Sequence, residues 1–222
     1  MPVAIDVPIR LDITNIEFVR QISTQVMRVV HERDNYVCRC CGFRSTKYQQ
    51  VLNLNGNWRD LDAITTACIF CQQCFSLDAA AQMRSGVLLI FPDMEQSELN
   101  RLAVEIYLAR VTGNESAMDQ ANRCLAFLMN LREAAVDQFG SYEPTALAGI
   151  LRDGQTDGAA ETVKRRLTRV RLFPSDRRIL RQADLEYNQF PQIMAFWRSA
   201  AGPYPGSSAS FPALESFVAN YL

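Results

Sequence analysis

Two pairs of cysteines in this 222-residue chain repeat the same short interval, Cys38 with Cys41 and Cys68 with Cys71. A Cys-x-x-Cys turn presents two thiolates from one tight loop, and two such turns supply the four sulfur ligands of a tetrahedral structural zinc site. The 26 residues between the pairs contain no histidine. The spacing therefore predicts a structural Zn2+ that cross-links two segments far apart in the sequence.

The spacing alone does not identify the fourth zinc ligand, because Cys74 repeats the interval after Cys71. Either Cys68 with Cys71 or Cys71 with Cys74 would complete the site. We favour Cys68, since the residues before it predict a strand that ends at the site, with Cys71 opening the helix that follows. Cys40 is expected to point away from the metal, and Cys124 falls on the apolar face of a predicted helix, where a buried cysteine is typical.

The composition is that of an ordinary globular protein with no excess of positive charge. Lysine and arginine total 23, aspartate and glutamate total 24, and the formal net charge is −1 with an isoelectric point near 5.9. A dedicated duplex-DNA binder usually carries a basic excess, so this balance argues against nucleic acid as the main partner. The odd number of cysteines, seven, suits a reducing compartment better than a disulfide framework.

We expect a soluble protein that does not insert into a membrane. The N-terminus has neither the basic n-region nor the apolar h-region of a signal peptide. The longest uninterrupted apolar run, residues 87–91, is far shorter than the roughly 20 residues that span a bilayer.

Hydrophobic periodicity divides the chain into a small cysteine-rich part and a mainly helical part, which together predict an α+β fold. The expected domains are an extended leader over residues 1–12, a zinc-binding core over 13–86, a mainly α-helical region over 87–200, and a linker with a short C-terminal docking segment over 201–222. In the core we expect a helix from the capping-box pair Thr14 and Glu17 to about Glu32, strands at 48–54 and 61–67, and a helix from about Cys71. In the helical region we expect a strand at 87–91 and helices from about Asp93 and at about 115–138, 144–151, 159–171 and 175–187.

The cysteine-rich part resembles the HNH, or ββα-metal, nuclease fold, in which Cys-x-x-Cys turns flank a pair of strands and a helix follows. Hydrolysis by that fold needs an imidazole to activate water and ligands to hold a divalent metal ion. Here Leu52, Asn53 and Gln72 stand where histidines would be expected, and the one histidine of the chain, His31, precedes the whole unit. The resemblance thus implies an HNH-like core without catalytic residues, and we expect no enzymatic activity.

Other features have both a structural and a binding interpretation. The basic stretch that includes Arg165, Arg166 and Arg169 is typical of a solvated helix face, but it could also bind phosphate groups or an acidic segment of a partner. The apolar stripe that ends in Phe196 and Trp197 could belong to the core or form an exposed interface. The C-terminal helix is too short to be stable alone, so it must dock on this chain, on a second copy or on a partner.

Several segments resemble the IcmJ/DotN family, in order and at similar separations, over about residues 25–185. The cysteine segment at residues 66–75 is the most specific of them, and the tail beyond about residue 200 is not covered. The other segments are residues 33–38, 41–43, 48–54, 88–94, 98–100 and 169–175. The family motif has three cysteines in its second cluster, matching Cys68, Cys71 and Cys74, so it leaves the fourth ligand open.

The family serves type IVB secretion machines and related conjugation systems of I-complex plasmids. The resemblance implies a cytoplasmic, non-catalytic, zinc-containing adaptor held at the inner membrane through the C-terminal cytoplasmic part of the coupling ATPase. Other adaptors of the coupling complex would be further partners in a platform that recruits substrates. Two alternatives stand beside this interpretation: a divergent HNH-type nuclease that depends on His31, and a DNA-binding relaxosome component that uses Arg165 and Arg166. The sequence does not say whether effectors or plasmid DNA are moved.

Overall fold

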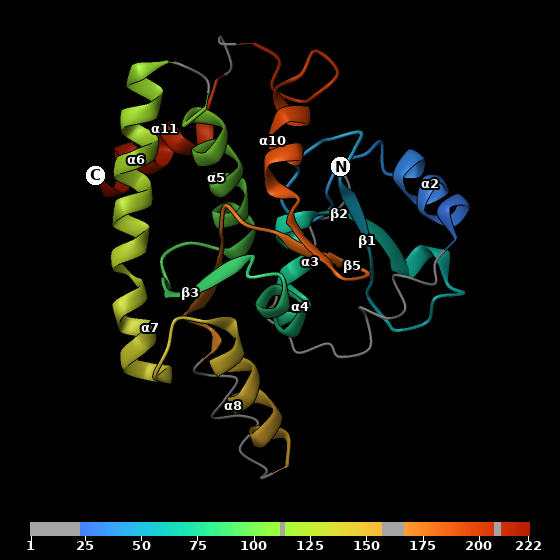
Figure 1. Cartoon of the computed structure of the whole chain (residues 1–222), viewed down its shortest axis with the longest axis horizontal. Helices are drawn as coiled ribbons and strands as arrows, with labels where there is room; N and C mark the ends of the chain where they lie inside the picture. The colour runs from blue at the N-terminus through green and yellow to red at the C-terminus, as the bar shows by residue number, and fades with distance from the viewer. Residues whose placement is uncertain (1–22, 112–113, 157–166, 207–209) are drawn as a thin grey trace.

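Helices and short antiparallel strand pairs make up the fold, which is therefore of the α+β class (Figure 1). The computed structural model describes residues 23–111, 114–156, 167–206 and 210–222, except for the side chains of residues 152–156. The extended leader predicted for residues 1–12 and the helix start predicted at Thr14 lie outside the described residues.

The elements up to the first buried strand of the helical part are short. They are α2 (Thr24–Arg33), β1 (Gln49–Asn53), the 3-10 turn η1 (Leu61–Ala63), β2 (Ile64–Cys68), α3 (Ile69–Cys74), α4 (Leu77–Gln82) and β3 (Gly86–Ile90). The remaining elements are α5 (Gln96–Ala109), α6 (Glu115–Asn130), α7 (Arg132–Phe139), α8 (Pro144–Thr156), β4 (Val170–Pro174), β5 (Ile179–Gln182), β6 (Leu185–Asn188), α10 (Phe190–Arg198) and α11 (Pro212–Tyr221).

The cysteine-rich part contains the two strands that the sequence predicts, followed by two helices in place of one. Strands β1 and β2 pair antiparallel, with Gln49 opposite Cys68. The second strand begins at Ile64, three residues later than expected, because η1 forms a tight turn there. The single predicted helix is divided into α3 and α4, since Ser76 leaves the helical region of backbone conformation at φ −151° and ψ 87°.

Helix α2 and the turn after it cover the outer edge of β2. The Asp34 carboxylate accepts a hydrogen bond from the Thr66 backbone N–H at 2.8 Å, and Arg33 donates to the backbone carbonyls of Leu61 and Ile64. On the same edge, the Arg39 N–H donates to the Thr66 carbonyl at 2.9 Å. An edge strand with free backbone groups invites pairing with other chains, and these contacts satisfy them instead.

A second antiparallel pair lies in the helical part and joins segments far apart in the sequence. Strand β3 pairs with β4 along its whole length, from Gly86 opposite Pro174 to Ile90 opposite Val170. Helix α5 packs against β4, and α7 packs against β3. Helices α6 and α7 follow one another along the side of the molecule that lies opposite α2 (Figure 1).

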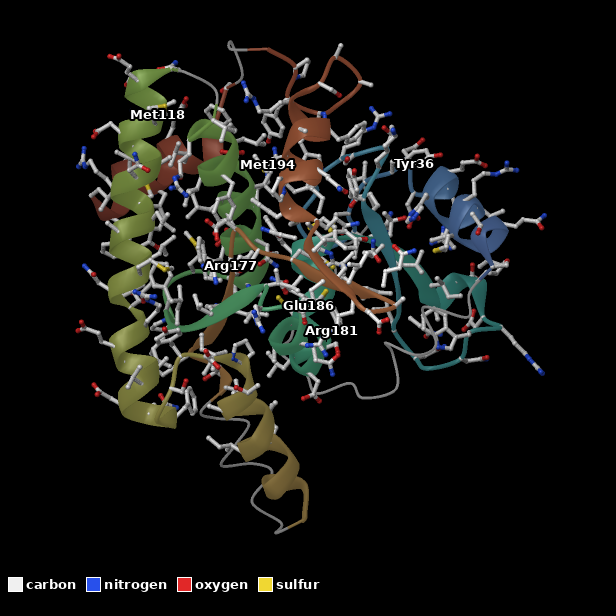
Figure 2. The ribbon with its side chains drawn as sticks, viewed as in Figure 1. Tyr36, Met118, Arg177, Arg181, Glu186 and Met194 are labelled. Carbon is white, nitrogen blue, oxygen red and sulfur yellow. The ribbon has the colours of Figure 1, made fainter. Side chains whose placement is uncertain are left out.

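Two predictions for the stretch between residues 159 and 187 fail. Part of the helix expected at 159–171 lies outside the described residues, but Val170 and Arg171 belong to a strand, because they pair with β3. The helix expected at 175–187 is a hairpin, in which β5 and β6 turn at residues 183–184. Arg181 and Glu186 form an ion pair across that hairpin (Figure 2). The helix expected at 115–138 is divided into α6 and α7, and Leu131 is the C-cap residue of α6.

One large hydrophobic cluster joins the cysteine-rich part and the helical part, and a separate small cluster of Val30, Val51 and Ile64 lies in the cysteine-rich part. Trp197 of α10 is 1% exposed and meets the ring of Phe43 edge-on at 4.9 Å between centroids. The ring of Phe70 in α3 also lies edge-on to Trp197, at 6.0 Å. Helix α8 packs against α4 in addition. Aromatic burial of this kind is a large stabilising contribution, so the core joins the two parts into one packed body.

The C-terminal helix α11 docks on this chain, the first of the three alternatives that the sequence allows. It packs against α5 and α6, and Phe217 and Tyr221 contact the ring of Phe91. The buried Glu105 carboxylate of α5 accepts hydrogen bonds from the first backbone N–H groups of α11, at Ala213 and Leu214. A carboxylate at a helix N-terminus satisfies unpaired donors and complements the helix dipole.

Candidate metal centre

The sulfur atoms of Cys38, Cys41, Cys68 and Cys71 form a compact cluster, in which all four lie within 4.8 Å of one another. The Cys41 and Cys68 sulfurs are 3.7 Å apart. Four sulfurs at about 2.3 Å from a tetrahedral Zn2+ would be about 3.8 Å apart, so the cluster has nearly the dimensions of a zinc site. The residues present therefore fit a structural zinc ion.

The first cysteine pair lies on a tight turn closed by backbone hydrogen bonds. The Cys38 N–H donates to the Phe43 carbonyl at 2.9 Å, and the Gly42 N–H donates to the Cys38 carbonyl at 2.9 Å. Gly42 has φ of +74°, in the left-handed region that favours glycine. An isolated bridge between Val37 and Arg44 closes the base of the turn. The turn thus holds two sulfurs on one side without help from a sheet.

The second pair spans the junction between β2 and α3, as the sequence predicts. Cys68 ends the strand and is the N-cap of α3, and its sulfur accepts a hydrogen bond from the Cys71 N–H at 3.4 Å. The first turn of a helix favours negative charge, because its backbone N–H groups have no partners within the helix. The helix start therefore stabilises the thiolates that a metal ion requires.

The remaining cysteines lie outside the cluster. Cys74 donates its thiol to the Phe70 carbonyl at 3.4 Å, and burial raises the pKa of that thiol to about 12. The geometry therefore groups Cys68, and not Cys74, with the other three sulfurs. Cys124 is buried in α6, in the core, as its apolar helix face predicts. Cys40 is buried beside the cluster and within hydrogen-bonding reach of Cys38, so it does not point away from the site as expected.

Electrostatics at the cluster favour a bound cation. Burial alone would raise the pKa of the Cys38 thiol, but hydrogen bonds from neighbouring thiols hold that pKa well below its ordinary value. For Cys68 and Cys71, burial and the neighbouring sulfurs raise the pKa well above the ordinary value. A divalent cation would stabilise thiolates that are crowded together in a buried site.

A hydrogen-bonded chain connects the cluster to α5 and β4. The Asn100 side-chain amide donates to the Cys71 sulfur at 3.3 Å and to the Cys74 sulfur at 3.7 Å. The Asn100 carbonyl oxygen in turn accepts from the Gln96 side chain at 2.9 Å. Gln96 also exchanges two hydrogen bonds with the Leu172 backbone, each of 2.8 Å. Groups that hydrogen-bond to metal ligands orient them and tune their affinity for the metal.

Sequence reasoning missed Gln96 and Asn100, although a weak signal for them is present. Both lie on the face of α5 that carries Leu99, Leu102 and Ala103, and they are 4% and 0% exposed. Polar residues four apart on a buried helix face need partners, because an unpaired buried amide is costly. That pattern indicates a polar contact inside the core, but not which partner it meets.

The positions at which the HNH resemblance leads us to expect imidazoles make structural contacts. Leu52 is buried, and the Asn53 side chain accepts hydrogen bonds from the N–H groups of Asn55 and Gly56, which closes the turn after β1. His31 lies next to Thr66, with 3.1 Å between its Nδ1 and the threonine hydroxyl, and burial lowers its pKa although Asp34 acts to raise it. Within the described part of the chain, the sulfur cluster is the one group of three or more His, Cys, Asp or Glu side chains with metal-site dimensions.

Of the residues predicted to bind a partner, those that the structure describes do not form one surface. Arg165 and Arg166 lie outside the described residues, and Arg169 is exposed just before β4. Phe196 is half-buried, with its ring 5.9 Å from that of Tyr48. Trp197 belongs to the core, so its interpretation as an interface residue is corrected.

The basic stretch, which continues in the sequence to Arg181, is also partly internal. Arg171 is 7% exposed, and its guanidinium donates to the backbone carbonyls of Met94, Thr168 and Val170. Arg178 is 9% exposed and donates to the Gln189 side chain, and burial lowers its pKa to about 10. These two arginines therefore stabilise the fold and are not available as a docking face.

Comparison with known proteins gives one informative relation. No family model matches the chain. The type 4 apparatus protein DotN of Legionella pneumophila is 28% identical to it over 162 residues, which cover 70% of this chain and 74% of that protein. This similarity supports the assignment of the chain to the IcmJ/DotN family. Residues 66–75, the segment with the most specific resemblance to that family, contribute two sulfurs to the cluster.

No helix among the described residues combines the length and the apolar character that crossing a bilayer requires. Whether residues 13–86 form a separate HNH-like domain stays a prediction. The described strands and α3 do follow one another in the order strand, strand, helix.

Proposed function

We propose that this protein is a non-catalytic adaptor of a type IVB secretion or conjugation coupling complex, built around a structural Zn2+ held by Cys38, Cys41, Cys68 and Cys71. The observation that carries the proposal is the four-sulfur cluster in a chain similar to DotN. Four thiolates occupy every position of a tetrahedral zinc ion, whereas catalytic zinc sites keep one position open. Such an ion contributes to folding and leaves no position for a substrate.

The surroundings of the cluster support a binding role rather than an enzymatic one. Leu52 and Asn53 take the place of the imidazoles of the HNH-like fold and are buried at 4% and 7% exposure. His31 contacts Thr66 and Tyr36 rather than a second metal-binding group. A general base needs access to a reacting group, and the buried positions of Leu52 and Asn53 do not provide it.

The partner in this proposal is the C-terminal cytoplasmic part of the coupling ATPase, together with other adaptors of the coupling complex. Support comes from the relation to DotN, whose name assigns it to a type 4 apparatus. The protein would be cytoplasmic and peripheral to the inner membrane through that ATPase. Zinc would keep the cysteine-rich part rigid, and a rigid surface loses little conformational entropy when a partner binds.

Co-purification tests the adaptor role directly. A tagged form of the full chain, recovered from its native host under reducing conditions, is expected to retain the coupling ATPase, identified by mass spectrometry. The C-terminal cytoplasmic part of the ATPase, produced alone, is expected to bind the purified zinc-loaded protein. The proposal fails if the ATPase is present in the lysate and neither experiment recovers it.

The two alternatives make different predictions that the same preparation can check. A divergent nuclease would cleave DNA with Mg2+ or Mn2+, and His31→Ala would abolish the cleavage. A relaxosome component would bind DNA with an affinity that falls steeply with salt and with charge reversal at Arg165 and Arg166. The adaptor proposal expects neither behaviour.

A further inference from the structure

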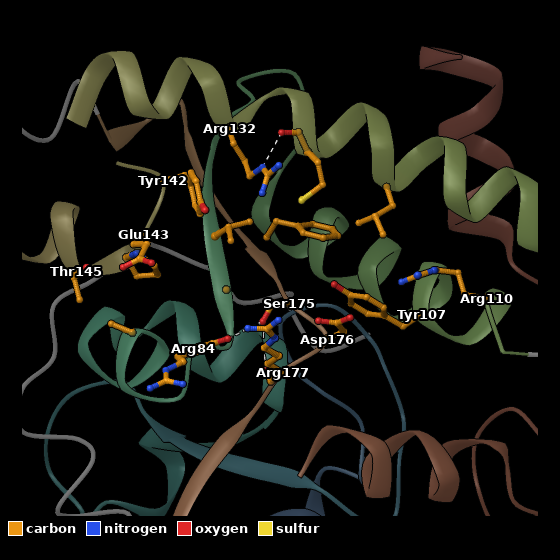
Figure 3. A pocket seen from close by; sticks show the side chains of 17 residues that line it. Arg84, Tyr107, Arg110, Arg132, Tyr142, Glu143, Thr145, Ser175, Asp176 and Arg177 are labelled. Carbon is orange, nitrogen blue, oxygen red and sulfur yellow. Dashed lines mark hydrogen bonds between the residues drawn. The ribbon is translucent and has the colours of Figure 1, made fainter. Parts of the chain in front are cut away.

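Two adjoining cavities form a groove whose lining includes none of the cluster cysteines. The first has a volume of ≈ 410 Å³ and lies among α4, β3, α6, the turn from α7 to α8 and the segment after β4 (Figure 3). The second, of ≈ 640 Å³, continues along α10. Tyr107, Arg110 and Asp176 line both cavities, so the two are neighbours. We call the pair the arginine groove.

The groove takes its name from five arginines, which come from separate elements. They are Arg84, Arg110, Arg132, Arg177 and Arg198. In Figure 3, Arg132 enters the first cavity from α7, Arg84 and Arg177 lie on the opposite wall, and Arg110 stands at the end of α5. Because the five converge from different parts of the sequence, no local charge run in the chain indicates the groove.

These arginines have no charged partners among the residues that the structure describes. The ion pairs of the described chain involve Arg28, Arg33, Arg101 and Arg181 instead. Arg110 donates to the Asn122 side chain and Arg132 to the Met129 carbonyl, both neutral groups. A guanidinium with a neutral partner keeps most of its donors free for a carboxylate, which it can bind through two parallel hydrogen bonds.

The charge of the groove differs from that of the whole chain. The chain carries 23 basic and 24 acidic residues, whereas the groove has five arginines against two acidic residues, Glu143 and Asp176. Its floor is apolar, with Phe173 and Met129 in the first cavity and Phe190 and Met194 in the second. Arg177 and Met194, one from each cavity, are marked in Figure 2. An apolar floor with a cationic rim fits a ligand that is acidic and also offers apolar side chains.

We propose that the arginine groove binds an acidic segment of a partner protein, with carboxylates on the five arginines and apolar side chains on the floor between them. The shape favours a peptide over a small anion, because two connected cavities extend from the α7–α8 turn to α10. Methionines on the floor can adapt to side chains of different shape. The source of the segment rests on the proposed function, in which the coupling ATPase or another adaptor supplies it.

A matched pair of peptides tests the groove without reference to any named partner. The probe is a fluorescein-labelled peptide of glutamate with interspersed leucine and phenylalanine, and its control carries glutamine at every glutamate. Fluorescence anisotropy with the zinc-loaded full chain is expected to show at least tenfold tighter binding of the acidic peptide, with an affinity that falls with salt. Equal affinity for the two peptides would overturn the proposal.

Substitutions locate the binding. The triple variant R110Q/R132Q/R177Q removes three groove charges and is expected to weaken the acidic peptide at least tenfold. The control R28Q/R44Q/R59Q removes three exposed arginines of the cysteine-rich part, with the same change in net charge, and is expected to bind as the wild type does. Circular dichroism verifies that both fold. The proposal fails if the two variants bind alike, or if a single-stranded DNA oligonucleotide binds the groove as tightly as the peptide.

The same variants separate this proposal from the adaptor role. If the C-terminal cytoplasmic part of the ATPase binds the wild type and the groove variant equally, while the acidic peptide distinguishes them, the groove serves another partner protein and the adaptor role stands. If that part binds neither the control variant nor the wild type, and co-purification does not recover the ATPase either, the adaptor role fails. The peptide experiment still decides the groove.

Discussion

At the scale of single residues, the contact between Asn100 and Cys71 is the clearest determinant of metal affinity outside the ligands. The amide donates to the sulfur at 3.3 Å, in a fully buried site. We expect Asn100→Ala to lower the Zn2+ affinity about 10–100-fold, the usual effect of losing a group that orients a ligand. Competition with a chromophoric chelator measures it. Asn130→Ala, at an exposed position of α6, is the control, and equal affinities for the two variants would contradict the role of Asn100.

Gly42 permits the first cysteine turn by its backbone conformation alone. Its φ is +74°, and a methyl group added there would meet no atom within 4 Å. We therefore expect Gly42→Ala to lower the free energy of unfolding by about 1 kcal/mol, through backbone strain and not through a clash. Gly149 gives the opposite control, since it lies inside α8 with equally open space. Gly149→Ala should raise stability by about 0.5–1 kcal/mol, and chemical denaturation measures both changes.

Only those features of the site that depend on short-range spacing could be predicted from the sequence. The four cysteines and the missing histidines are visible because a Cys-x-x-Cys turn is defined within four residues. Asn100 and Gln96 reach partners that are 29 and 76 residues away, and no local pattern carries that information. The choice of Cys68 over Cys74 was predictable only through its strand, because the spacing permits both.

At the scale of elements, Glu105 holds the C-terminal helix in place. Its carboxylate accepts from the Ala213 and Leu214 N–H groups and pairs with Arg101 at 3.2 Å. We expect Glu105→Ala to lower the free energy of unfolding by about 1–3 kcal/mol, because the buried N–H groups of Ala213 and Leu214 lose their acceptor. Hydrogen exchange should show α11 opening more readily than α5 in that variant. Protection of α11 equal to that in the wild type would contradict the anchoring role.

The Glu105 carboxylate also makes the stability of the protein depend on pH. Burial raises the pKa of Glu105, and the hydrogen bonds from Leu214 and Arg101 offset only part of that effect. The folded state therefore binds this proton more tightly than the unfolded state does. Relative to Glu105→Gln, which cannot titrate, the wild type should gain stability as the pH falls from neutrality to about 4.5, the ordinary glutamate value. Denaturation of the two proteins at several pH values measures the difference, and a constant difference would contradict the raised pKa.

Elements that depend on distant pairing were the ones that the sequence mispredicted. Strand β4 exists because it pairs with β3, about 80 residues earlier in the chain, and such partners override local helix preference. The hairpin of β5 and β6 turns at Ala183, which has a φ of 52°. Glycine or asparagine usually indicates such a turn in a sequence, and neither is present at this position. By contrast, α5 carries apolar periodicity and lies close to where the sequence places it.

At the scale of the whole molecule, the sulfur cluster and the helical part depend on one shared core. Phe43, one residue after Gly42 of the first cysteine turn, packs edge-on against Trp197 of α10. Arg101 also spans the two parts, with its guanidinium 5.8 Å from the Phe43 ring centroid and hydrogen-bonded to the Tyr204 hydroxyl. A disturbance of the first cysteine turn should therefore reach α10 and the segment before α11.

Zinc removal tests this dependence, with Trp197 as the reporter. A Trp58→Phe variant leaves Trp197 as the one tryptophan, since the chain has two. Chelation under reducing conditions is expected to lower the melting temperature and to shift the Trp197 emission to longer wavelength, because a structural zinc site contributes several kcal/mol to folding and Phe43 moves with its turn. Returning Zn2+ should restore both signals, whereas Mg2+ should not, because thiolates bind hard cations weakly.

If the metal is shown to be lost and neither signal changes, the cluster does not stabilise the fold. If the melting temperature falls while the Trp197 emission stays constant, the cysteine-rich part unfolds separately, and the shared core does not couple it to the helices.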